Sequence, residues 1–105
     1  MSVRGDAEAE YDLGLLLEMQ GDRAGALAAY RRADERGDAT GAFNVGLLLE
    51  EQGDRAGALA AFRRADERGH PDGAYNLGVL LWKQGDREDA MAAFRRTGRL
   101  RGQAT

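Results

Sequence analysis

The chain has 105 residues, about the size of one domain and too few for two independent hydrophobic cores. Its 15 basic and 18 acidic side chains leave a formal net charge of −3, which points to neither a nucleic acid nor an acidic membrane surface as partner. The absence of cysteine excludes disulfides and thiolate metal sites, and no apolar stretch approaches the roughly 20 residues that span a bilayer. We expect a single cytoplasmic domain over residues 1–105, without a membrane segment.

Internal repetition organises the chain. An offset of 32 residues aligns three units without a gap, residues 5–36, 37–68 and 69–100, and leaves a C-terminal tail at 101–105. A period of this length is typical of an array of stacked units. The first two units differ at only 8 of their 32 positions, whereas the third departs at both of its ends. Because atypical end units usually act as caps, we expect the third unit to do so.

Each unit is predicted to begin with a helix, for which residues 42–49 of the second unit give the pattern. Gly53 ends this helix, since glycine readily adopts the left-handed conformation of a helix C-terminus. Asp54 follows, and its carboxylate can accept hydrogen bonds from the free amides at the start of a second helix. Asp22 and Asp86 stand at the same place in the other units. A helical hairpin with a tight turn is therefore expected three times.

The second helix of each unit is predicted to bury one face. In the second unit, Ala58, Ala61, Phe62 and Ala65 follow the spacing i, i+3, i+4, i+7 that places side chains on one side of a helix. Charged residues fill the opposite side. This amphipathic pattern indicates a helix that packs on a partner helix and exposes its polar face.

The junctions between units repeat the signals that stop and start helices. Gly37-Asp38 and Gly69-His70-Pro71 lie between consecutive units, and Pro71 suits the first turn of a helix. At this position we predict His70 to be an exposed capping residue rather than a metal ligand or a catalytic group.

Arginine doublets recur once per unit, at residues 31–32, 63–64 and 95–96. Stacked units would align them into a stripe that can contact phosphates. Neighbouring acids cancel most of this field, so we predict a solvated helix face and no nucleic-acid partner. These acids are Asp34, Glu35, Asp66 and Glu67.

The recurring residues resemble the tetratricopeptide repeat (TPR) family, whose first helix carries Leu-Gly and whose second helix carries alanine with an aromatic residue four positions later. The matching residues are Leu13-Gly14 with Ala26 and Tyr30, Val45-Gly46 with Ala58 and Phe62, and Leu77-Gly78 with Ala90 and Phe94. The resemblance implies an all-α fold, an α-solenoid of three helix-turn-helix repeats, acting as a protein-interaction scaffold. Each unit is two residues shorter than the usual 34, and the shortened junction is similar to that of Sel-one-like repeats.

Catalysis has little support in the sequence. The chain contains one histidine, one lysine, one serine and no cysteine, which leaves few candidates for a nucleophile or an acid–base pair. Glu50 and Glu51 are adjacent and point about 100° apart on a helix, so they do not form a catalytic carboxylate pair. We predict that the protein is not an enzyme and has no cofactor and no metal site.

The first helix is apolar on two sides, and this leaves two interpretations open. In the second unit, Ala42 and Val45 lie on one side, whereas Phe43 and Leu47 lie well round the helix. The second side either lines a binding groove or packs on the neighbouring unit in place of the tryptophan that the family has. The predicted groove consists of Tyr11, Leu15, Glu18, Phe43, Leu47, Glu50, Glu51, Tyr75, Val79 and Trp82.

The predicted groove combines apolar and acidic side chains, so its partner should be a protein or peptide that is apolar with basic residues beside the apolar ones. Trp82 takes the slot of Glu18 and Glu50, and it is either a binding anchor or a cap on the last hairpin. The family's clamp for a C-terminal carboxylate needs basic side chains in this groove. It is not expected here, because apolar residues fill those slots.

A second class of function is self-association through the ends of the array. Residues 1–36 carry 5 basic and 8 acidic groups, net −3, and residues 69–105 carry 6 and 4, net +2. A head-to-tail homo-oligomer, weakened by salt, is therefore the alternative to a binding module. In either case Leu48 and its equivalents are predicted to belong to the core.

Overall fold

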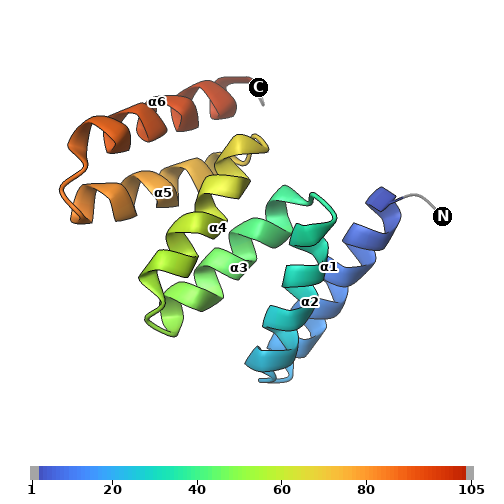
Figure 1. Ribbon diagram of the computed structural model, residues 1–105. Coiled ribbons are helices and arrows are strands. Elements are labelled where there is room, and N and C mark those ends of the chain that lie inside the picture. The colour runs from blue at the N-terminus through green and yellow to red at the C-terminus, as the bar shows by residue number, and fades with distance from the viewer. Residues whose placement is uncertain (1–2, 104–105) are drawn as a thin grey trace.

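The computed structural model describes residues 3–103, which form six helices and three hairpins (Figure 1). The helices are α1 (Val3–Met19), α2 (Arg23–Glu35), α3 (Ala39–Glu51), α4 (Arg55–Glu67), α5 (Pro71–Lys83) and α6 (Arg87–Gln103). Contacts join the two helices of each hairpin and join α2 to α3 and α4 to α5. The predicted all-α solenoid of three helix-turn-helix repeats is confirmed.

The predicted turn chemistry is present at the helix ends. Gly53 has a φ of 83° after α3, and Gly69 has a φ of 84° after α4. The Asp54 carboxylate accepts a hydrogen bond from the Gly57 amide at 2.9 Å, which satisfies one of the free amides that begin α4. Asp38 does the same for Gly41 at 3.0 Å. These bonds are local in sequence, which is why the hairpins could be predicted.

The last helix is longer than the internal ones. It has 17 residues, against 13 in α4. Arg101 stands where Gly37 and Gly69 end the earlier second helices, and without a glycine α6 continues to Gln103. Residues 101–103 of the predicted tail are therefore helical, and residues 104–105 lie outside the described part.

The apolar stripe of the second helix forms the core as predicted. Ala58, Ala61, Phe62 and Ala65 are fully buried. The Phe62 ring lies directly against Gly46, where a Cβ atom would be 2.5 Å from the nearest ring carbon. The glycine of the first helix is therefore required for the close approach of the aromatic ring.

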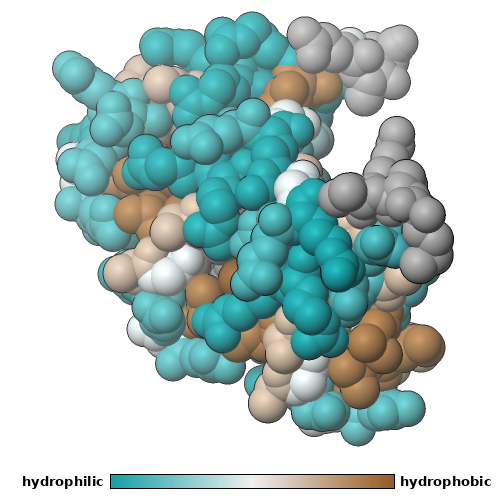
Figure 2. Space-filling view, turned by 45° about the vertical axis from the view of Figure 1, so that its right-hand side comes forward, coloured by the Kyte–Doolittle hydropathy of each residue, from teal (hydrophilic) through white to brown (hydrophobic). Residues whose placement is uncertain are grey.

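The first helix of the array differs from its two equivalents in burial. Leu48 in α3 is 4% exposed, whereas Leu16, the same residue in the same slot of α1, is 57% exposed. The prediction that every equivalent of Leu48 belongs to the core is therefore wrong for Leu16. The side chain of Leu48 is covered because α2 packs on α3, and no helix in the described chain precedes α1. Apolar surface is visible over the first hairpin (Figure 2).

Ion pairs connect the second helices of successive units. Arg64 in α4 binds the Asp34 carboxylate of α2 at 2.6 Å, and Arg68 binds it at 2.7 Å. Burial would raise the pKa of Asp34, but the hydrogen bonds from Arg64 and Arg68 outweigh this effect and hold the pKa below its usual value. Arg64, the second residue of the doublet at 63–64, thus forms an ion pair with an acid of the preceding unit.

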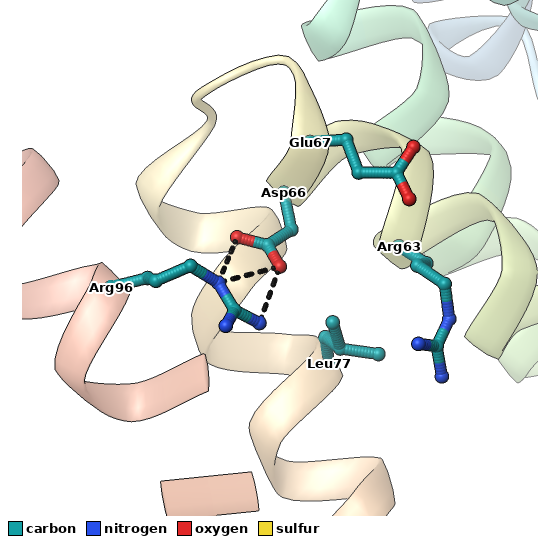
Figure 3. A pocket seen from close by; sticks show the side chains of 5 residues that line it. All are labelled: Arg63, Asp66, Glu67, Leu77 and Arg96. Carbon is teal, nitrogen blue, oxygen red and sulfur yellow. Dashed lines mark hydrogen bonds and ion pairs between the residues drawn. The ribbon is translucent and has the colours of Figure 1, made fainter. Parts of the chain in front are cut away.

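The second junction repeats one of the two ion pairs, since Leu100 takes the slot of Arg68. Arg96 in α6 reaches Asp66 in α4 at 2.7 Å, while Arg63 and Glu67 project on the other side of a pocket of about 400 Å³ (Figure 3). Asp66 is buried, as is Asp34. The prediction that both acids lie on a solvated face is therefore wrong, because each belongs to an ion pair between units.

Candidate functional site

The aromatic residues of the predicted groove pack on the second helix of their own unit. The ring centroids of Tyr11 and Tyr30 are 5.7 Å apart, and those of Phe43 and Phe62 are 5.8 Å apart. Tyr75 is 5.6 Å from Phe94 in the third unit, yet it remains 45% exposed. Each of these rings therefore packs on the second helix of its own unit and keeps part of its surface exposed, and its place in a binding groove stays a prediction.

The aliphatic members of the predicted groove are partly exposed. Leu15 is exposed, and Leu47 and Val79 are half-buried. Met19, one turn after Leu15, is 83% exposed and extends the apolar surface of α1, although it was not among the predicted residues. Met19 is the equivalent of Glu51 in the second unit, which was predicted to line the groove. The repeat therefore already indicated that Met19 is exposed.

The acidic members of the predicted groove are exposed and have different surroundings. Glu18 accepts a hydrogen bond from the Tyr30 hydroxyl at 2.7 Å. Burial and this hydrogen bond raise the pKa of Tyr30. Glu51 lies 3.5 Å from Arg23, an exposed pair that is screened by solvent, and Glu50 is exposed on the same helix. All three carboxylates can therefore attract a basic partner.

Trp82 lies at an apolar pocket in the third unit. Val79, Trp82, Lys83 and Phe94 line this pocket, which has a volume of about 310 Å³. Trp82 is 48% exposed, and the Arg87 guanidinium carbon lies 5.3 Å from the centre of its ring. The structure thus brings together Val79 and Trp82 of the predicted groove and adds Phe94, whose equivalents Tyr30 and Phe62 are fully buried.

His70 links the junction to the predicted groove. Its Nδ1 accepts a hydrogen bond from the Gly73 amide at 3.0 Å, and its ring stacks on Phe43 at 4.7 Å. The predicted capping role is confirmed, but the side chain is half-buried rather than exposed, because Phe43 covers it. Burial lowers the pKa of His70, and the nearby Asp72 and Asp38 act in the opposite direction.

We expect the stability of the chain to fall as the pH drops below about 6.5, because protonated His70 cannot accept the Gly73 amide bond and its pKa is lower in the folded than in the unfolded state. The stabilisation is present above the unfolded-state pKa and is lost between that value and the folded-state pKa. The measurement is the urea midpoint at about pH 7.5 and about pH 5.5. His70→Asn is the control, since asparagine caps without titrating. An equal drop in both proteins would contradict the assignment.

The described residues offer neither a metal cluster nor a membrane span. Residues 3–103 hold no group of three or more His, Asp or Glu side chains placed to bind a metal ion. The same part of the chain has no helix both long and apolar enough to cross a membrane.

Three stacked hairpins, in which each second helix packs on the next first helix, define the chain as a helical-repeat protein. It belongs to the tetratricopeptide repeat family, because a sequence model of that family matches residues 43–104 and a second one matches residues 8–36. The family is one of protein-interaction modules. The likeness of the junctions to Sel-one-like repeats stays a prediction.

Solved structures share the fold. A crystal structure of MamA superposes with a TM-score of 0.77 at 21% identity, covering 98% of this chain and 62% of that one. The N-terminal domain of stress-induced protein-1 (STI-1) from C. elegans gives 0.75 at 23% identity, covering 95% of this chain and 87% of that one. The chain thus spans less than two thirds of the MamA structure. No curated protein sequence matches it.

Proposed function

We propose that the protein binds a polypeptide segment along the predicted groove on its first helices. The observation that carries this proposal is the apolar pocket at Val79 and Trp82, since Leu15 and Leu47, the equivalents of Val79 on α1 and α3, are also exposed or half-buried. Large exposed aromatic side chains are over-represented among the residues that contribute most to binding. A non-catalytic scaffold role is consistent with the family and with the small set of reactive side chains.

The charges favour a basic partner. Glu18, Glu50 and Glu51 are exposed beside the apolar residues of α1 and α3. An amphipathic helix with lysine or arginine next to its apolar face would place its charges against these carboxylates. We therefore propose such a segment as the ligand and expect acidic peptides to bind poorly. A cytoplasmic location remains part of this proposal.

A labelled basic amphipathic peptide is expected to bind, and Trp82→Ala is expected to weaken the binding about tenfold or more, which corresponds to ~1.4 kcal/mol or more. Fluorescence anisotropy of the peptide measures both affinities, because the variant lacks the tryptophan signal. Leu16→Ala is the matched control: it truncates an exposed apolar residue outside the predicted groove, and it should leave the affinity unchanged.

The melting midpoint of Trp82→Ala distinguishes the two roles of Trp82. Lower affinity with an unchanged midpoint supports an anchor in the groove. A lower midpoint with unchanged affinity shows that Trp82 covers the last hairpin instead. If neither the native chain nor the Leu16→Ala variant binds any basic amphipathic peptide, the groove proposal is wrong.

Self-association through the ends is the second candidate, and one observation favours it. Met91 in α6 is 45% exposed, whereas its equivalents are buried in α2, at Leu27, and half-buried in α4, at Leu59. Leu13 and Leu16 are exposed at the other end of the array. Both ends of the array therefore expose apolar side chains to a second copy.

A further inference from the structure

Both internal junctions depend on contact between a glycine and an alanine. A Cβ atom on Gly41 in α3 would lie 2.7 Å from the Cβ of Ala33 in α2. A Cβ atom on Gly73 in α5 would lie 2.6 Å from the Cβ of Ala65 in α4. Carbon atoms in contact are about 3.5 to 4 Å apart. The two helices of each junction therefore approach so closely that α3 has no room for a side chain at residue 41, and α5 has none at residue 73.

The two ends of the chain carry larger residues at these positions. Ala9 in α1 stands where Gly41 and Gly73 stand, and Thr97 in α6 stands where Ala33 and Ala65 stand. The Thr97 side chain is buried, and its hydroxyl donates to the Ala93 carbonyl oxygen at 3.1 Å, which fixes its orientation. A second copy placed on α6 in the internal register would bring Ala9 into the space that Thr97 already fills.

The polar groups at the ends do not match the internal junctions either. Gly98 replaces the acid that Asp34 and Asp66 supply, and Arg32, the equivalent of Arg64, binds Glu10 of its own unit instead of an acid of a preceding one. Glu10 replaces a fully buried alanine, Ala42 in the second unit. Glu10 binds Arg32 at 2.8 Å and Arg36 at 3.4 Å, so stacking would remove solvent from these charged groups together, which is costly even for a paired charge.

The last turn of α6 also takes up space that a following unit would need. His70 of the third unit covers Phe43 of the second. Over Tyr75, the equivalent of Phe43, the chain places its own Arg101, whose guanidinium carbon is 5.7 Å from the ring centre and which binds Asp72 at 3.0 Å. A second copy would have to displace this side chain.

We infer that Ala9, Glu10, Thr97 and Gly98 prevent a second copy of the chain from stacking head to tail in the register of the internal junctions. The apolar ends alone would let such contacts propagate, because a heterologous contact of this kind does not close on itself. The four residues oppose this with a steric overlap, with the loss of solvent around the Glu10 ion pairs and with the missing acid at position 98. The inference goes beyond the proposed groove and opposes the second candidate function, since it predicts that the native chain does not form linear assemblies in this register.

Two variants test the inference with one junction only. In each of them one end of the chain is changed to the internal type, and we call them the half-corrected variants. Ala9→Gly with Glu10→Ala gives the chain an internal-type N-terminal end, and Thr97→Ala with Gly98→Asp gives it an internal-type C-terminal end. Each variant alone should stay at the monomer mass of 11.4 kDa, as should the native chain. Their equimolar mixture should form a dimer, because one corrected end of each kind is present. Analytical ultracentrifugation at about 10 μM to about 1 mM measures the mass.

The variant with all four changes should grow into longer chains as its concentration rises. Circular dichroism and melting curves check that the half-corrected variants fold. In the mixture, Leu13→Asp on the chain that supplies the N-terminal end should abolish the dimer. Two results would overturn the inference: concentration-dependent growth of the native chain, or a mixture of folded half-corrected variants that stays monomeric.

Discussion

Leu48→Ala is expected to lower the free energy of unfolding by ~2 to 5 kcal/mol. The Leu48 side chain is 4% exposed and packs in the cluster that contains Val45, Phe62 and Leu80. Much of this core consists of alanine, so few side chains nearby can move into the cavity that the substitution leaves. For a domain of this size the loss corresponds to a drop of roughly 10 °C or more in the melting midpoint, which calorimetry measures.

Leu16→Ala is the matched control, since it makes the same chemical change at the same slot of α1. Leu16 is 57% exposed, so its truncation should change the stability by about 0.5 kcal/mol or less. Similar losses in both variants would show that α1 is covered in solution. An unchanged midpoint for Leu48→Ala would contradict the packing of α2 on α3.

Gly46→Ala is expected to be the second strongly destabilising change. Its new Cβ would lie 2.5 Å from one carbon of the Phe62 ring and 2.6 Å from another. Phe62 is fully buried and lies against Phe43, so its ring cannot move aside. Overpacking of this kind costs ~1 to 3 kcal/mol or more, and it has to exceed the gain of ~1 kcal/mol that alanine brings to a helix. Urea unfolding measures the difference.

Gly98→Ala is the control for helix propensity. Gly98 lies inside α6, and no atom beyond its neighbours lies within 4 Å of a Cβ placed there. The variant should therefore be more stable than the native chain by up to ~1 kcal/mol. If Gly46→Ala is as stable as Gly98→Ala, the contact of the Phe62 ring with α3 is not as close in solution.

The candidate site was predictable in part. The recurrence of Tyr11, Phe43 and Tyr75 identified partly exposed positions of the first helices, since the period of the repeat places equivalent residues on equivalent faces. The pocket at Trp82 also involves Phe94, which lies in the next helix. Phe94 is accessible there although Phe62 is not, because no unit follows α6 in the described chain. Sequence identity between units could not reveal that difference.

The sequence by itself determined the hairpins. Gly53 and Asp54 act on amides and carbonyls within four residues of themselves, so their effect is readable without knowledge of the rest of the chain. The same holds for Pro71 at the start of α5 and for the alanine stripe of α4, whose spacing requires one buried side. Local rules of this kind recur with every unit.

Only the tertiary structure decided which copy of a repeated residue is buried and which charges pair. Leu16 and Leu48 both stand in the run Gly-Leu-Leu-Leu-Glu, yet only Leu48 has a preceding second helix against its own helix in the described chain. Asp34 accepts a hydrogen bond from Arg64, which lies 30 residues later in the chain and across the junction. The arginines that neighbour Asp34 in α2 are not its partners in this bond. Burial and pairing depend on the neighbouring unit, and within the described chain no unit precedes α1 or follows α6.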